Sequence, residues 1–193
     1  PVDFPDDVER IVGDPHFIDP LKEAIGARSF DLVVASYGRL AVIAEAFAGQ
    51  EQKPERSAVF VAVTLEESGL LGSKYYVAHP SIPLDQTVGV INLDAMSVAG
   101  RARDITVVGM GNSELEDILK PIAERQGRTL MEESNPAGGY YFRSDHFNFA
   151  KAGVPALYPD GGNDLLEGGK AAGDDAGKLY NESHYHKPGD HYD

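Results

Sequence analysis

Two adjacent glutamates are the first candidates for chemistry in this sequence. Glu66 and Glu67 directly follow an apolar run at 58–64 that is rich in β-branched residues. Neighbouring carboxylates at the end of a buried strand repel each other and lose hydration unless a proton or a cation compensates. A metal ion would supply that compensation. The alternative is a solvated loop at the start of a helix, where Glu is favoured.

Two further segments carry suitable groups. Asp94 ends a second apolar run, 87–93, although Asp is also common in simple turns. Segment 183–191 reads Ser-His-Tyr-His-Lys-Pro-Gly-Asp-His. Tags and disordered tails are also rich in His, but neither explains the pattern Tyr-His-x-Pro-x-Asp.

Carboxylate oxygen and imidazole nitrogen are ligands that suit Zn²⁺, and folding would have to bring these three segments together. One glutamate of the pair could then hold the metal while the other takes a proton from a water on that metal. Such a water has a pKa of about 7, so that attack on an amide carbonyl becomes feasible at neutral pH. The three segments together favour a zinc site with a general base more than any one of them does.

Strands and helices must alternate to position these groups. Hydrophobic patterns predict a buried central parallel strand at 58–64 and further strands at 87–93 and 105–108, with a short apolar run at 32–35 before them. Helices are predicted at 40–48, ending at Gly49, at about 70–79, ended by Pro80, and at 113–126, where Ser113 and Glu116 form a capping box and Pro121 a kink.

This order predicts an α/β fold, a three-layer αβα sandwich with a mostly parallel central sheet, in which ligands lie at the carboxyl ends of the strands. We expect one domain over residues 1–193, with a poorly defined segment at 1–29 that is rich in Pro and Asp. The Gly-rich stretch 161–180 shows no periodicity and is predicted to be a loop, and it is the region that we expect to move.

The composition excludes several classes of protein. Its net charge of −14 repels phosphate backbones and anionic lipid, so we expect no nucleic-acid partner. The chain has no Cys, so any zinc must be held by His and carboxylate. No apolar run approaches the roughly 20 residues that span a bilayer. We also expect no signal peptide before Pro1. We expect no membrane association.

Five ordered segments resemble the co-catalytic di-zinc aminopeptidases, a family of the zinc exopeptidase superfamily that also holds glutamate carboxypeptidases and glutaminyl cyclases. The resemblance covers about residues 40–193. Its segments are Val-Thr-Leu-Glu-Glu-Ser-Gly-Leu-Leu-Gly-Ser at 63–73, Ile-Asn-Leu-Asp at 91–94, Phe-Arg-Ser-Asp-His-Phe at 142–147, Ala-Gly-Val-Pro-Ala at 152–156 and Tyr-His-Lys-Pro-Gly-Asp at 185–190.

Carried over by position, the resemblance implies two zinc ions and a role for each matching residue. Glu66 would be the general base. Glu67 and His186 would ligate one zinc, and Asp94 the other. Tyr185 would donate a hydrogen bond to the oxygen of the tetrahedral intermediate. Ser144, Asp145 and His146 would line the pocket and support the site from behind, or would simply be buried and hydrogen-bonded.

Two motifs of that family do not appear as written: a His-x-Asp after a strand, and an Asp-Asn-Ala-Ser-Gly whose Asp bridges the metals. The segment before the helix at 40–48 keeps Ala35-Ser36 and Gly38, but Val33 or a neighbour stands in the place of the bridging Asp. The nearest acid, Asp31, is out of register, and His16 lacks a preceding strand. Each zinc would keep at most two protein ligands, so we expect weak metal binding.

Three functions follow as hypotheses. The first is an aminopeptidase that releases N-terminal residues from peptides with a free N-terminus, located in the periplasm or secreted, as the resemblance implies. The second is a non-catalytic or metal-deficient homologue that keeps the fold as a scaffold or binding domain. The third is an acyltransferase similar to glutaminyl cyclase, which also requires the absent bridging Asp. Oligomeric state and residue preference are left open.

Overall fold

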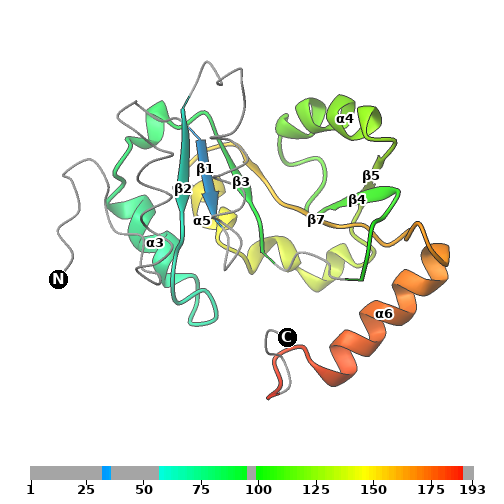
Figure 1. Ribbon diagram of the computed structural model, residues 1–193. Coiled ribbons are helices and arrows are strands. Elements are labelled where there is room, and N and C mark those ends of the chain that lie inside the picture. Colours follow the sequence, from blue (N-terminus) through cyan, green and yellow to red (C-terminus); the bar gives the residue numbers. More distant parts are fainter. Residues whose placement is uncertain (1–31, 36–56, 95–98, 189–193) are drawn as a thin grey trace, which may run out of the picture.

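A computed structural model describes residues 32–35, 57–94 and 99–188 of the chain (Figure 1). The predicted helix at 40–48 and the residues Asp31 and His16 lie outside this part. The elements are β1 Leu32–Ala35, β2 Ala58–Val61, α3 Leu71–Ala78, η2 Leu84–Gln86, β3 Gly89–Asn92, β4 Asp104–Val107, α4 Leu115–Arg125, β5 Thr129–Glu132, η3 Pro136–Gly138, η4 Tyr140–Phe142, α5 His146–Lys151, β6 Ala156–Leu157, β7 Pro159–Gly161 and α6 Gly169–Ser183.

The β-branched runs form a four-stranded parallel sheet in the order β2-β1-β3-β6. One of its faces packs on helices α3 and α5 through a core of Val90, Phe149, Val154 and Ala156. Val59 and Val61 of β2 extend this core, while Ala58 and Phe60, which alternate with them, are buried on the other face. Burial on both faces explains the continuous apolar runs, and the α/β fold is confirmed.

A second sheet of three strands in the order β5-β4-β7 carries helix α4 (Figure 1). Strand β5 is parallel to β4, whereas β7 is antiparallel to it. Strands β5, β6 and β7 and helix α5 had no counterpart among the predicted elements. They are two to six residues long, which is too short for a periodic pattern to show.

Two predictions about single elements are wrong. Strand β2 was expected to be central, but it lies at one end of the described parallel sheet. The stretch 161–180 was expected to be a loop, but residues 169–183 form helix α6. Its glycines hid the helix because Gly costs about 1 kcal/mol relative to Ala inside a helix.

The start of helix α4 also differs from the prediction. Helix α4 begins at Leu115, and the Ser113 hydroxyl accepts a hydrogen bond from Leu115 N at 3.2 Å. The Glu116 carboxylate binds Gly111 N at 2.8 Å instead of turning back to Ser113. Ser113 therefore caps the first residue of α4, whereas Glu116 holds the preceding turn at Gly111, and the two do not form a reciprocal capping box.

Candidate metal centre

The acid-bearing strands end at one edge of the parallel sheet. Strand β1 lies between β2 and β3, and its last residue, Ala35, pairs with both Val61 and Asn92. The loop with Glu66 and the loop with Asp94 therefore leave the sheet at the same level, on either side of the end of β1. This is the edge at which ligands bind in parallel α/β sheets.

The loop that carries the glutamate pair has a strained backbone. Leu65 and Leu70, on either side of the pair, have φ angles of 59° and 58°. Such left-handed conformations cost L residues about 1 kcal/mol or more and persist where the surroundings impose them. Here the Glu66 carbonyl accepts hydrogen bonds from Gly69 N at 3.1 Å and Leu70 N at 2.9 Å, which holds the turn closed.

The segment with the glutamate pair contains a second glycine, Gly72, because a side chain would not fit at that position. A Cβ atom at this position would lie 2.2 Å from Thr64 O and 2.7 Å from Thr64 N. Gly72 N also donates to Thr64 O at 3.0 Å. The first turn of α3 thus presses directly on the backbone just before Glu66, and only glycine allows that approach.

Glu67 and His186 come together from distant parts of the sequence. Glu67 Oε1 lies 3.2 Å from His186 Nε2, and both side chains are exposed. His186 itself has a φ of 55°, so the third non-glycine residue with positive φ in the described part of the chain also belongs to this site. The ring of Tyr185 packs edge-on against the His186 ring at 4.1 Å between centroids. Two predicted ligands of one zinc are therefore neighbours.

A chain of two hydrogen bonds, from Asn92 to Ser144 and from Ser144 to Asp94, holds the Asp94 carboxylate. The Ser144 hydroxyl donates to Asp94 Oδ2 at 2.5 Å, and Asn92 Nδ2 donates to Ser144 Oγ at 2.7 Å. Asn92 and Ser144 are buried. Such partners fix the direction of a carboxylate ligand, which is the role expected for Ser144.

The electrostatics of Glu66 suit a proton acceptor. Burial, followed by the charges of Asp94, Glu67 and Asp145, raises the pKa of the Glu66 carboxyl to about 7. Burial and the charges of Glu67, Asp94 and Glu66 also raise the pKa of the Tyr185 phenol, which keeps it a hydrogen-bond donor at neutral pH. The negative charges of Glu67 and Asp94 therefore act on both Glu66 and Tyr185.

Asp145 and His146 lie behind this edge, at the start of helix α5. Both are buried, and burial raises the pKa of Asp145. One carboxylate oxygen of Asp145 and both ring nitrogens of His146 are buried without a hydrogen-bond partner in the described structure. The His146 ring lies between Tyr141 and Tyr158, with centroids at 4.7 and 4.9 Å. Burial accordingly lowers the pKa of His146 to about 4, so the ring is neutral.

Three further residues of the site were missed by the sequence analysis. Asn92 had no predicted role of its own. Asn148 donates to Leu70 O at 3.1 Å and to Ser73 Oγ at 2.9 Å, which ties α5 to the glutamate loop. Asp160 has a pKa raised to about 6 by burial and by Asp94, against the lowering effect of its bond to Gly161 N. Nothing in the sequence marked Asn148 or Asp160, although Asn92 follows an apolar run, as Asp94 does.

The donor set fits zinc in its chemistry but is incomplete in the described residues. Carboxylate and imidazole groups with uncompensated negative charge are what a zinc ion requires. Glu67 and His186 converge as one pair and Asp94 stands on the other side. In residues 57–94 and 99–188, no group of three His, Asp or Glu side chains is close enough to hold an ion.

The sequence matches the family model described as peptidase family M28 over residues 36–193. The chain belongs to peptidase family M28. Members of this family are generally zinc-dependent metallopeptidases, and the match does not favour a scaffold that has lost the metals. The resemblance inferred from the five sequence segments is thereby confirmed.

Solved structures show that this M28 chain shares its fold with aminopeptidases. The LapA aminopeptidase of Legionella pneumophila superposes with a TM-score of 0.53 at 17% identity, over 76% of this chain and 43% of that one. The aminopeptidase from Aneurinibacillus sp. strain AM-1 gives 0.52 at 19% identity, over 79% and 43%. The M28 chain thus spans less than half the length of these structures. No protein with a curated description matches it.

Proposed function

We propose that this M28 chain belongs to a zinc-dependent aminopeptidase that removes N-terminal residues from peptides with a free N-terminus. The observation that carries the proposal is the approach of Glu67 to His186 at the edge where β2 and β3 end. A carboxylate and an imidazole from opposite parts of a chain, beside a glutamate with a raised pKa, form a set suited to metal-assisted hydrolysis. Two zinc ions and a periplasmic or secreted location are part of the proposal.

In this proposal Glu67 and His186 would hold one zinc and Asp94 the other, and the bound metal would supply positive charge that polarises the peptide carbonyl and favours deprotonation of water. Ser144 and Asn92 keep the Asp94 carboxylate in one orientation. The Glu66 carboxylate takes a proton from the water while the oxygen of that water bonds to the carbonyl carbon of the peptide. The protonated Glu66 then gives that proton to the departing amine nitrogen as the C–N bond breaks.

Tyr185 acts on the oxygen of the peptide carbonyl. Its raised pKa keeps the hydroxyl protonated, so that it donates a hydrogen bond to the negative charge that develops there. Tyr185 is 45% exposed, so a bound peptide can approach it. The second glutamate of the pair cannot take the role of the base, because its carboxylate already faces His186.

The test compares Glu66→Gln with Glu67→Gln. We expect Glu66→Gln to abolish release of anilide from a leucine anilide substrate while zinc content, measured by elemental analysis, stays that of the parent. Glu67→Gln should lower both. Zinc bound by the parent near two ions per chain supports the proposal, whereas a content near zero, or activity that survives Glu66→Gln, contradicts it.

A further inference from the structure

Helix α6 links the metal centre to a distant loop. It begins at Gly169, separated by two residues from the end of loop 162–166, and its last residue, Ser183, stands three residues before His186. At a rise of about 1.5 Å per residue, a helix of 15 residues is about 22 Å long. Figure 1 shows α6 projecting away from the second sheet, with its last turn leading towards the C-terminus.

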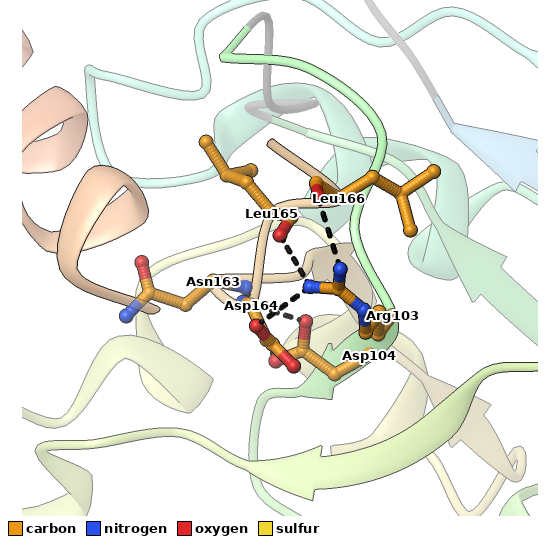
Figure 2. Close-up of polar contacts among 6 residues, drawn as sticks. All are labelled: Arg103, Asp104, Asn163, Asp164, Leu165 and Leu166. Atoms are coloured by element: carbon orange, nitrogen blue, oxygen red, sulfur yellow. Dashed lines mark hydrogen bonds and ion pairs between the residues drawn. The ribbon is translucent and has the colours of Figure 1, made fainter. Parts of the chain in front are cut away.

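Arg103, just before β4, fastens loop 162–166 from one side (Figure 2). Its guanidinium donates to Asp164 Oδ1 at 3.1 Å, to Leu165 O at 2.6 Å and to Leu166 O at 3.0 Å. Arg103 N also donates to Asp164 O at 2.8 Å. A planar fork with several donors is suited to hold three oxygens in one arrangement.

Asp104 fastens the same loop from inside. Its buried carboxylate accepts hydrogen bonds from Asn163 N at 3.1 Å and Asp164 N at 2.9 Å. A Cβ atom at Gly162 would lie 2.1 Å from Asp104 O, so the loop touches the backbone of β4. Arg103 and Asp104 thus both hold the loop against the start of strand β4.

The first half of α6 is seated on this loop. Gly173 is the buried residue of the helix, and a Cβ atom there would lie 2.0 Å from Asn163 O. Asn163 Nδ2 also donates to Asp174 Oδ1 at 2.5 Å. From Gly177 onwards every residue of α6 is exposed. The direction of the helix is therefore set at its first two turns.

A helix that is seated at one end acts as a lever. A tilt of about 10° at the start of a helix of about 20 Å moves its far end by about 3 to 4 Å. A zinc–nitrogen bond is about 2.0 to 2.1 Å long, so a displacement of that size would separate His186 from a metal held by Glu67.

We propose that loop 162–166, held by Arg103 and Asp104 and seated against Gly173, is the pivot that aims helix α6, so that Arg103 and Gly173 are positioning residues for His186. The use of this device in catalysis rests on the proposed zinc function. The coupling between pivot and helix end is a property of the chain itself and can be measured without metal.

The first experiment measures the helix direction. Spin labels are attached after Lys120→Cys on α4 and Asn181→Cys on α6, and the chain contains no other cysteine. We expect Gly173→Ala to shift or broaden the distance distribution by about 3 Å or more, as the lever estimate requires. Gly177→Ala is the matched control, because it brings the same helix propensity but its Cβ meets nothing within 4 Å. Coinciding distributions for Gly173→Ala and the parent overturn the proposal.

The second experiment uses Arg103→Met and zinc alone as the probe. We expect broadening of the same distance distribution and a zinc affinity about 10- to 100-fold weaker in a chelator competition, as for other residues that position a ligand. Arg101→Met is the control, since Arg101 meets Leu166 only through its carbonyl. Weaker zinc binding with an unchanged distance distribution overturns the pivot. If the parent binds no zinc, the proposed function fails, and the distance measurement still decides this inference.

Discussion

Ser144 donates a hydrogen bond of 2.5 Å to the Asp94 carboxylate, and this contact joins the start of α5 to the end of β3. Ser144→Ala removes the donor that directs Asp94 and leaves the buried Asn92 amide without its acceptor. We expect zinc affinity about 10- to 100-fold weaker in a chelator competition. Ser113→Ala is the control, because Ser113 lies at the start of helix α4 and contacts none of the proposed zinc ligands in the described structure. It should leave zinc affinity unchanged, and equal affinities for the two variants would show that Ser144 does not position a zinc ligand.

His186 and His184 offer a test within one segment. His186 faces Glu67, whereas the His184 ring stacks on Tyr180 with an interplanar angle of 4°. His186→Ala should reduce bound zinc by about one ion per chain in elemental analysis, because it leaves only Glu67 of the two ligands proposed for that zinc, and a catalytic zinc usually has three protein ligands. His184→Ala should keep the zinc content of the parent. The reverse result would mean that the wrong histidine has been assigned.

Gly72 is the place where a single methyl group should disturb the glutamate loop. Gly72→Ala forces a Cβ atom to within 2.2 Å of Thr64 O, so α3 or the loop must move. Overpacking of this kind costs about 1 to 3 kcal/mol of unfolding free energy, which urea denaturation measures. Gly177→Ala, with open space around its Cβ, should be neutral or slightly stabilising. Equal midpoints for both variants would show that the contact is readily relieved.

The sequence predicted the parts of this site that long apolar runs position. Strands β2 and β3 have clear apolar runs, so the sequence alone places their carboxyl ends, and with them Glu66 and Asp94, at one edge of the sheet. The meeting of Glu67 with His186 followed only from the family resemblance, because no local pattern relates residues so far apart in the chain.

Other parts depended on tertiary contacts that leave no local pattern. Helix α6 contains three glycines, and the close approach of Gly173 to Asn163 explains one of them, but that approach is invisible in the sequence. Asn148 ties α5 to α3 through single hydrogen bonds. Its neighbours on both sides are phenylalanines, which gave no indication of a polar role.

The buried ring of His146 predicts a specific dependence of stability on pH. Its pKa is about 4 in the folded protein and 6.5 ordinarily, so between these values the unfolded chain binds more protons. The free energy of unfolding should therefore rise as pH increases from about 4 to about 6.5, with a contribution of up to about 3 kcal/mol that is lost as pH falls through this range. Glu66 and Asp160, whose pKa values are raised, contribute the opposite slope.

His146→Phe isolates this contribution, because it keeps a ring between Tyr141 and Tyr158 and removes the titrating group. The slopes due to Glu66 and Asp160 are common to parent and variant and cancel in the difference. Urea denaturation at a series of pH values should show the variant gaining stability relative to the parent as pH falls from 6.5 towards 4. Parallel curves for the two proteins would mean that the His146 ring accepts a proton in the folded state as readily as in the unfolded one, and the neutral buried imidazole would have to be abandoned.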